Sequence, residues 1–341
     1  MTAAAVLTGA GGKRIRVGAA TADRVRKVAD KLGYAPNLVA RQLSGQPSKL
    51  IGVVAADWFH ALSLRMLSWL NKTADEHGYR IISSQTNHQQ RQLEQYLREC
   101  GGRGVDGVIY LAMDDDAVWP EASKLFRAIP CVVSLMGDPG IKHGHRVRTD
   151  FGHGVALAVE HLYSQGRHRI VQVLEDVELD ANRQRQAGLR AAFEKLGLPF
   201  TDESICVASK DWEIDDPRFD ELIEELVVCR QADAILGDND NGAIALMNAL
   251  RRRGIQPGED VAFVGWGSDT IARLSYPTLT TVKFHLDQIA EHAIRTIIES
   301  GSTTLTEPRV MDVPVDLIVR ESSTMPPRES MPSSQPKGDL R

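Results

Sequence analysis

Features of membrane, secreted and disulfide-bonded proteins are scarce in this sequence. No apolar run approaches the roughly 20 residues that a membrane-spanning helix requires. The first residues do not place a charged segment ahead of a long apolar one, as a secretion signal would, so we expect a cytoplasmic protein. The 4 cysteines among 341 residues are widely separated, which predicts buried free thiols rather than a disulfide framework or a metal site.

Catalytic motifs are missing as well. The sequence contains no GxSxG nucleophile motif, no P-loop and no paired-carboxylate motif. The glycine-rich segment at 9–12 does not follow a strand-like run, so it does not indicate a dinucleotide-binding turn. His143 and His145 share the segment 142–145 with no cysteine or acid that would complete a metal site. We therefore expect a protein that is not an enzyme and that holds neither a metal nor a cofactor.

Charge is unevenly distributed along the chain. The first 49 residues contain nine basic and two acidic side chains, although the whole chain has a formal net charge of −5. A basic head on an acidic body predicts contact with a polyanion. Charge alone would fit a solubilising terminus equally well, so the pattern within the head has to decide.

Two short helices are expected in the head. Apolar residues recur at helical spacing over 20–32, and Gly33 ends that segment. Pro36 can begin a second helix, because its missing N–H is no loss in a first turn. Gly45 and Pro47 end this second helix. A helix of roughly eight residues is marginal in water by itself, so it needs a partner surface on which to fold.

From Leu50 onward, short apolar runs alternate with longer amphipathic segments. The predicted strands lie at 51–56, 79–84, 105–111, 130–135, 169–174, 204–208, 232–237 and 260–265. The predicted helices lie at 61–77, 89–99, 151–165, 181–197, 217–229 and 240–253. This alternation predicts parallel sheets covered by helices on both faces. The segment HRVRTD at 145–150 separates two groups of four strands, which favours an α/β protein with two open parallel-sheet lobes over a single barrel.

A longer set of motifs points to one known family. The segment VRKVADKLGYAPNLVARQLSGQPSKLIGVV at 25–54 resembles the last headpiece helix, the hinge helix and the first sensor strand of the lac-repressor family. The further matching segments are GVALAVEHLYSQGRHRI (154–170), RQAGLRAAFEKLGL (185–198), ADAILGDNDNGAIALMNAL (232–250), GIQPGEDVAFVGW (254–266), YPTLTTVKF (276–284) and VPVDLIVRES (313–322). The resemblance covers nearly everything from Val6 to Ser322, and such an ordered set is far more specific than any single motif.

The resemblance implies a ligand-responsive DNA-binding transcriptional regulator, a repressor, whose effector binds between two lobes of periplasmic-binding-protein type. Its expected partners are operator DNA, a small-molecule effector and a second copy of the chain in a homodimer. The match begins only at the end of the recognition helix, at 6–9, so we expect a truncated helix-turn-helix head whose start lies upstream. The alternative is a sugar-like small-molecule binding protein that has lost DNA binding.

The same resemblance sets the expected domain boundaries. Residues 1–48 form a partial helix-turn-helix headpiece and hinge helix, and 49–321 form the sensor. Within the sensor, lobe one comprises 50–147 plus 283–308, and lobe two comprises 150–278 plus 309–320. The tail 322–341 is rich in proline and serine, which predicts disorder.

DNA contacts are expected on the hinge helix. In the family, paired hinge helices enter the minor groove and insert a leucine between base steps, which kinks the DNA. The matching residue is Leu43, flanked by Asn37, Arg41 and Gln42. An apolar wedge suits this task because it can replace base stacking without a hydrogen-bond partner. The plainer reading is that Leu43 only joins the linker to the sensor.

Seven residues are expected in the ligand site. Arg185 stands in the family's RxxG pattern, and its planar guanidinium suits hydroxyl or carboxylate groups. Asn239 follows a strand whose carboxyl end should face the cleft, and Asp240 is expected to cap the next helix. Trp212 and Trp266 are strand-end aromatics. The remaining three residues end the first strand of the opposite lobe: Asp57, Trp58 and Phe59.

Two positions depart from the family's usual pattern. Leu135 and Gly267 stand where sugar-binding members carry aspartates. The loss of two acceptors makes an unmodified hexose less suitable and would leave Arg185 less neutralised. We therefore expect a sugar, a sugar acid or a related polar metabolite, with an acceptor-rich or anionic effector favoured over a simple hexose.

Overall fold

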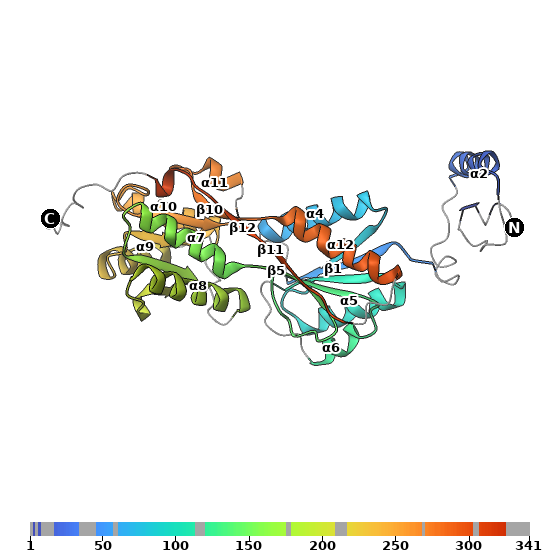
Figure 1. Ribbon diagram of the computed structural model, residues 1–341, viewed down its shortest axis with the longest axis horizontal. Coiled ribbons are helices and arrows are strands. Elements are labelled where there is room, and N and C mark those ends of the chain that lie inside the picture. The colour runs from blue at the N-terminus through green and yellow to red at the C-terminus, as the bar shows by residue number, and fades with distance from the viewer. Residues whose placement is uncertain are drawn as a thin grey trace.

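The sensor consists of two lobes placed end to end, each built on a six-stranded sheet with helices on both faces (Figure 1). The computed structural model describes residues 3, 6–7, 17–33, 46–56, 61–112, 120–174, 179–208, 217–267, 270–302 and 307–324. The predicted α/β fold with two open, largely parallel sheets is confirmed. In these ranges no helix has both the length and the apolar character needed to cross a bilayer.

The first lobe has the strand order β11-β5-β4-β3-β1-β2, and all its strands are parallel. Its strands are β1 (Leu50–Ala55), β2 (Arg80–Gln85), β3 (Gly107–Leu111), β4 (Val132–Leu135), β5 (His145–Thr149) and β11 (Val310–Val313). Its helices are α4 (Ala61–Glu76), α5 (Gln90–Arg103), α6 (Pro120–Phe126) and α12 (Leu286–Ser302). Met66 of α4 and Ile289 of α12 pack on one face of the sheet, and Leu93 of α5 and Phe126 of α6 pack on the other.

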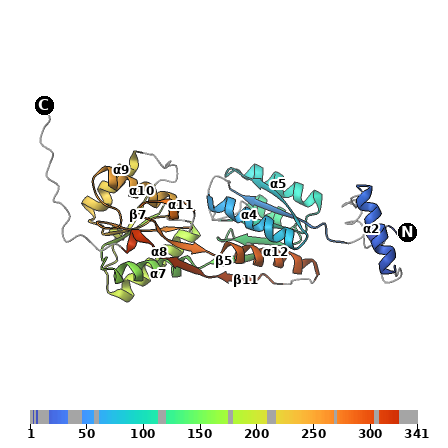
Figure 2. The same ribbon diagram turned by 90° about the horizontal axis from the view of Figure 1, so that it is seen from above.

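The second lobe repeats this plan with the order β12-β10-β9-β8-β6-β7. Its strands are β6 (Ile170–Leu174), β7 (Ile205–Val207), β8 (Ala234–Leu236), β9 (Ala262–Trp266), β10 (Thr280–Phe284) and β12 (Val315–Ile318). Its helices are α7 (Phe151–Ser164), α8 (Asp180–Leu196), α9 (Arg218–Ile223), continued by a π-helical segment Glu224–Cys229, α10 (Asp240–Arg252) and α11 (Thr270–Leu274). Figure 2 shows α7 and α8 on one side of this sheet and α9 and α10 on the other.

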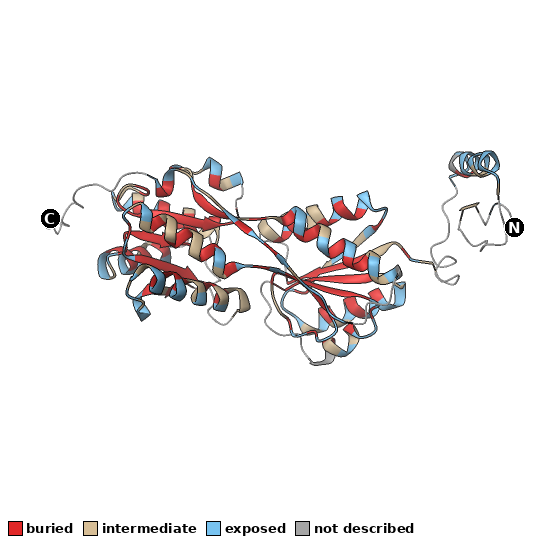
Figure 3. Ribbon diagram, in the orientation of Figure 1, coloured by how far each residue is buried: buried red, intermediate tan, exposed pale blue. Residues whose placement is uncertain are grey.

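The central strands form as continuous apolar runs because helices cover both of their faces. In β1, Ile51 and Val53 pack toward α4 and α12, whereas Val54 packs toward α5. The same burial of strands beneath half-exposed helices is visible in both lobes (Figure 3). Gly197, with φ +69°, ends α8 in the left-handed conformation that glycine adopts without strain.

Three segments of the described chain connect the lobes: residues 149–151, 284–286 and 313–315. The last joins β11 to β12 and runs straight from one sheet into the other (Figure 1). Because of that, β11 lies parallel to β5, whereas β12 lies antiparallel to β10. One straight segment can pair in opposite senses only if the other strands of the two sheets point toward each other. The carboxyl ends of both parallel sheets therefore face the space between the lobes.

All eight predicted strands are present, but four further strands were missed. The segment HRVRTD was predicted to divide the lobes, yet 145–149 is β5 of the first sheet, where Val147 is buried and Arg148 exposed. β10, β11 and β12 were missed as well. These four strands lie at one edge of their sheets or next to it, and they flank the segments that cross between the lobes. They therefore lack the continuous apolar character of central strands.

Three boundary predictions were wrong. Residues 309–320 were assigned to the second lobe, but β11 pairs with β5 in the first lobe. The first lobe was expected to resume at 283, but β10 of the second lobe continues to 284, and the chain crosses back at 284–286. The predicted tail began at Ser322, but Ser322 and Ser323 are buried. Ser322 Oγ donates to the Phe263 carbonyl at 2.7 Å, so this segment completes the second lobe. Residues 325–341 lie outside the described residues.

In the head, α2 (Ala19–Lys31) confirms the first predicted helix. Of its apolar face, Ala29 is buried, whereas Val28 and Leu32 are exposed. The second predicted helix lies outside the described residues. Among the cysteines, Cys100, Cys131 and Cys206 are buried free thiols as predicted, whereas Cys229 is free but exposed.

Candidate functional site

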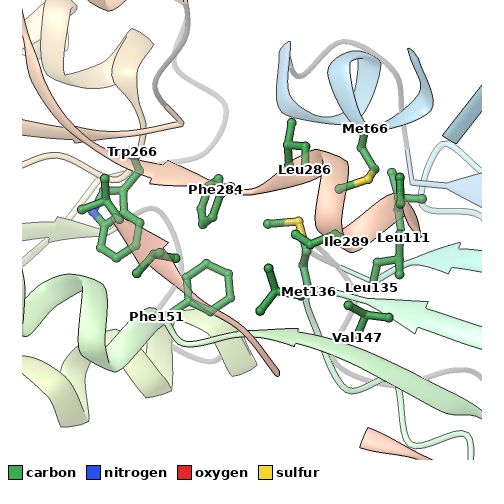
Figure 4. Packing of buried hydrophobic residues seen from close by; sticks show 14 of the residues in the cluster. Met66, Leu111, Leu135, Met136, Val147, Phe151, Trp266, Phe284, Leu286 and Ile289 are labelled. Atoms are coloured by element: carbon green, nitrogen blue, oxygen red, sulfur yellow. The ribbon is translucent and has the colours of Figure 1, made fainter. Parts of the chain in front are cut away.

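The space between the lobes is bounded by two chemically different walls. On the first lobe, β3 and β4 end in buried apolar residues, which include Leu111, Leu135 and Met136 (Figure 4). Leu135, one of the two positions that depart from the family pattern, is fully buried within this wall. On the second lobe, polar and aromatic residues occupy the equivalent strand ends and the start of α8.

Arg185 is the central polar group of the second wall. It lies on α8 and is only 6% exposed. Its Nη1 donates to Asp238 Oδ1 at 2.7 Å, to the Asp238 carbonyl at 3.2 Å and to Asn182 Oδ1 at 3.2 Å. Asp238 lies two residues after the end of β8, so the acid reaches Arg185 from a strand end. The expectation that Arg185 is poorly neutralised was therefore wrong, because Asp238 supplies the carboxylate.

Trp266 forms the aromatic support beneath this arginine. The Arg185 guanidinium carbon lies 4.2 Å from the centroid of the Trp266 ring and 5.2 Å from that of Phe151. Phe284 completes the cluster, with ring centroids 6.1 Å from Trp266 and 5.8 Å from Phe151. Gly154 leaves room for the indole, since a Cβ there would lie 2.7 Å from Trp266 Cη2. The indole is 2% exposed, so it fixes the orientation of Arg185 by a cation–π contact.

Asn239, and not Asp240 as expected, caps the helix that follows β8. Asn239 caps α10, because its side-chain Oδ1 accepts the Gly242 N–H at 2.8 Å. Asp240 is 1% exposed, and its Oδ1 accepts the Thr281 hydroxyl at 2.6 Å. The amide oxygen expected to contact a ligand is therefore committed to the helix, and a buried carboxylate lies behind the cap.

Arg65 is a cleft residue that sequence reasoning missed. It lies on α4 of the first lobe, and its Nη1 donates across the cleft to the Gly267 carbonyl at 3.0 Å. Burial lowers the pKa of Arg65, and the nearby Asp240 carboxylate opposes that shift. A signal was available in the sequence: Arg65 is the only charged residue in the first eleven of α4, among leucines and methionine.

Comparison with known proteins matches both the fold and the sequence. A profile described as a periplasmic binding protein-like domain matches residues 159–323. The chain is 24% identical over 308 residues to the repressor PurR of Vibrio parahaemolyticus, and 25% identical over 311 residues to the regulator DegA of Bacillus subtilis. These alignments cover 90% and 91% of both chains, respectively. The chain is therefore similar, over nine-tenths of its length, to transcriptional regulators of the lac-repressor type.

Solved structures of the family share the architecture. The lac repressor dimer bound to operator and an anti-inducer aligns with a TM-score of 0.78 at 20% identity, covering 94% of each chain. The CelR–cellobiose complex aligns with a TM-score of 0.71 at 22% identity, covering 93% of this chain and 98% of the other. At these identities the structures establish the fold, and the relatives are named as regulators rather than as enzymes.

A polar cavity of about 110 Å³ lies beside the first crossing. Its lining residues come from both lobes and include Met136, Asp138, Arg146, Arg148, Thr149, Asp180 and Gln184. Arg146 is paired with Asp138, and Arg148 makes a two-point pair with Asp312 at 2.8 and 3.0 Å. The cavity shows that polar groups of both lobes also approach each other on the hinge side of the cleft.

Several expected site residues lie outside the described residues. For the ligand site these are Asp57, Trp58, Phe59 and Trp212. For DNA they are Asn37, Arg41, Gln42 and Leu43. Their roles stay predictions from the family resemblance. Of the seven expected ligand residues, the structure places Arg185, Asn239 and Trp266 together at the second wall.

Proposed function

We propose that this chain is a ligand-gated repressor whose effector binds between the two lobes and controls binding of the head to operator DNA. The observation that carries the proposal is Arg185, buried at the facing strand ends and oriented by Asp238 and Trp266. A few convergent polar groups on an otherwise apolar surface are typical of small-molecule sites. A guanidinium held in this way has a fixed orientation.

The anchoring of the head supports coupling between effector and DNA. Just before β1, the backbone N–H and the hydroxyl of Ser48 donate to Asp106 Oδ1 at 2.8 and 2.9 Å, and the Lys49 N–H donates to Oδ2 at 2.9 Å. Asp106 precedes β3, so the end of the linker is fixed to the first lobe. A movement of the first lobe would therefore be transmitted to the head. Coupling of this kind is typically worth about 1–3 kcal/mol.

We propose a hydroxyl-bearing effector of the sugar class, including sugar acids. Arg185 with Asp238 offers a donor and an acceptor side by side, which suits hydroxyl groups. The apolar first wall around Leu135 and Met136 suits the C–H face of a ring. Because Asp238 neutralises Arg185, the charge balance no longer favours an anionic effector over a neutral one. The cellobiose complex of CelR supports the same class.

We also propose that the regulator acts as a cytoplasmic homodimer on operator DNA. The lac repressor structure that it resembles is a dimer bound to operator. Leu274 and Tyr276 are 78% and 74% exposed on the second lobe, beside α11, and such adjacent apolar side chains suit a subunit contact. The alternative function, a binding protein without DNA affinity, would leave the nine basic residues among the first 49 without a polyanion to contact.

Fluorescence anisotropy with labelled duplex DNA, at two salt concentrations, tests the proposal. We expect binding that weakens steeply with salt, as phosphate contacts require, and that changes when an effector found by thermal shift among sugars and sugar acids is added. Leu43→Ala should weaken binding to a bent palindromic site without changing effector affinity. An effector that binds tightly while the chain shows no DNA affinity would instead establish the binding-protein alternative.

A further inference from the structure

The hydrogen bond between Arg65 and Gly267 joins the two lobes, in addition to the crossings and the apolar core that they share. The partners are 202 residues apart in the chain, one on α4 and one directly after β9. The donor is a guanidinium and the acceptor a backbone carbonyl, so the contact is charge-assisted. It closes the side of the cleft formed by α4 and the end of β9.

The acceptor is held in a conformation that suits glycine. Gly267 has φ +127°, which L side chains rarely adopt. Its N–H donates to the Val282 carbonyl at 2.9 Å, so the peptide is fixed to β10. The backbone carbonyl of a residue that replaces the family's usual aspartate thus serves as a fixed acceptor for the arginine of the opposite lobe.

Electrostatics add to the hydrogen bond. Asp240 is buried in the second lobe, and its carboxylate stabilises the charged form of Arg65. Asp240 is itself held by Thr281 and is distinct from Asp238, which pairs with Arg185. In a partly buried setting, such an attraction is screened less than it would be on the surface.

The apolar core next to Arg65 also contains side chains from both lobes. Met66, which follows Arg65, belongs to one continuous apolar cluster with Met136 of the first lobe and with Trp266 and Phe284 of the second. These four side chains are 0–3% exposed although the walls come from different lobes. Figure 4 shows the residues of both walls turned toward the same space.

We propose that Arg65 is an interlobe latch that stabilises this arrangement of the two lobes. The contact made by Arg65 would replace part of the contact between the lobes that a bound ligand provides. The effector would then act on a closed state that is already populated. The latch concerns the regulation of the proposed effector site and in that sense rests on the proposed function. Its direct consequence, the shape of the ligand-free protein, does not.

Small-angle X-ray scattering of the full ligand-free chain tests the latch. We expect Arg65→Ala to shift the distribution of interatomic distances toward longer values, and Arg65→Lys, which keeps the charge but loses the planar fork, to shift it less. Arg80→Ala is the matched control, because Arg80 pairs with Asp75 on the surface of the same lobe and does not reach the second. Circular dichroism and melting curves establish that each variant is folded.

Superimposable scattering curves for Arg65→Ala and the wild type would overturn the latch. A loss of effector affinity in Arg65→Ala without any change of ligand-free shape would also overturn it, because Arg65 would then be a ligand contact. If Arg65→Ala is more open than the wild type, the latch is established even when no effector or DNA binding is found. A failure of the latch can therefore be distinguished from a failure of the proposed function.

Discussion

The two lobes have the same strand order and opposite cleft chemistry. Each sheet places its first strand between its second and third, and each is completed by one strand of the final crossing. Yet the first lobe ends its central strands in residues such as Leu135 and Met136, and the second places Arg185 and Asp238 there. The fold therefore determines where a site lies, whereas the residues at the strand ends determine its chemistry. We call the polar surface of the second lobe, around Arg185, the binding wall. The apolar surface of the first lobe, around Leu135, is the covering wall.

The largest expected effect concerns the covering wall. Leu135 is fully buried in the core cluster shared by both lobes, so Leu135→Ala should lower the free energy of unfolding by about 2–5 kcal/mol. Chemical denaturation measures the change. Leu64→Ala is the matched control, since Leu64 is 51% exposed on α4 and should change stability by less than about 0.5 kcal/mol. Equal effects of the two changes would contradict the covering role of this wall.

On the binding wall, removal of Arg185 should reduce effector affinity and also stability, because its buried pair with Asp238 is lost. Arg185→Ala takes away a charge-assisted contact and leaves Asp238 without this cation, which should cost about 2–4 kcal/mol of binding. Calorimetry with the effector measures the loss. Arg183→Ala on the same helix is the control, because Arg183 is half-exposed and pairs only loosely with Asp180. Unchanged affinity in Arg185→Ala would remove Arg185 from the site.

The support of the binding wall can be tested with a smaller change. Trp266→Phe keeps an aromatic ring beneath Arg185 but weakens the cation–π contact, which should cost about 1 kcal/mol of effector binding. Because the indole is buried, the variant will also lose stability, so affinity and melting temperature are measured together. A loss of stability with full effector affinity would restrict Trp266 to a packing role.

The smallest expected effect is a pH dependence that both lobes share. Burial lowers the pKa of His145 in the first lobe and of His161 in the second. The folded state therefore favours neutral imidazoles, whose contribution is complete above the unfolded pKa of about 6.5 and is lost as pH falls toward the lower folded values. Melting temperatures should fall between about pH 7.5 and pH 5.5, where histidine titrates.

Matched variants separate the two lobes in this experiment. His145 Nδ1 accepts the Arg309 N–H at 3.1 Å, and His161 Nε2 lies 2.7 Å from Ser323 Oγ. His145→Asn and His161→Asn should each reduce the acid-induced fall in melting temperature, whereas His143→Asn, at an exposed position, should not. An acid-induced fall that stays the same in both variants would place the pH sensitivity elsewhere.

Much of the fold could be predicted because its pattern is local. Central strands such as β1 and β3 are covered on both faces and are therefore continuous apolar runs, which neighbouring residues reveal. The strand β5 was missed because one of its faces is exposed and carries Arg146 and Arg148. β11 and β12 are short edge strands with only one buried residue each, so their sheet membership depends on pairing rather than on composition.

The candidate site was predictable in part. Arg185 and Trp266 could be named from their sequence motifs, which mark strand ends and a helix start. The cap of α10 was assigned to Asp240, whereas Asn239 caps the helix, because either Asn or Asp can cap and only the backbone angles determine which residue does so. The neutralisation of Arg185 by Asp238 could not be foreseen, since 53 residues separate them.

The sequence by itself determined the alternation of strands and helices, the two-lobed class and the family, because these depend on periodicity and on motifs a few residues long. Only the tertiary structure decided which polar groups meet across the cleft. Arg65 and Gly267 approach because three crossings bring α4 of one lobe over the end of β9 of the other. Such a contact depends on the relative placement of whole sheets, and no local pattern around either residue encodes it.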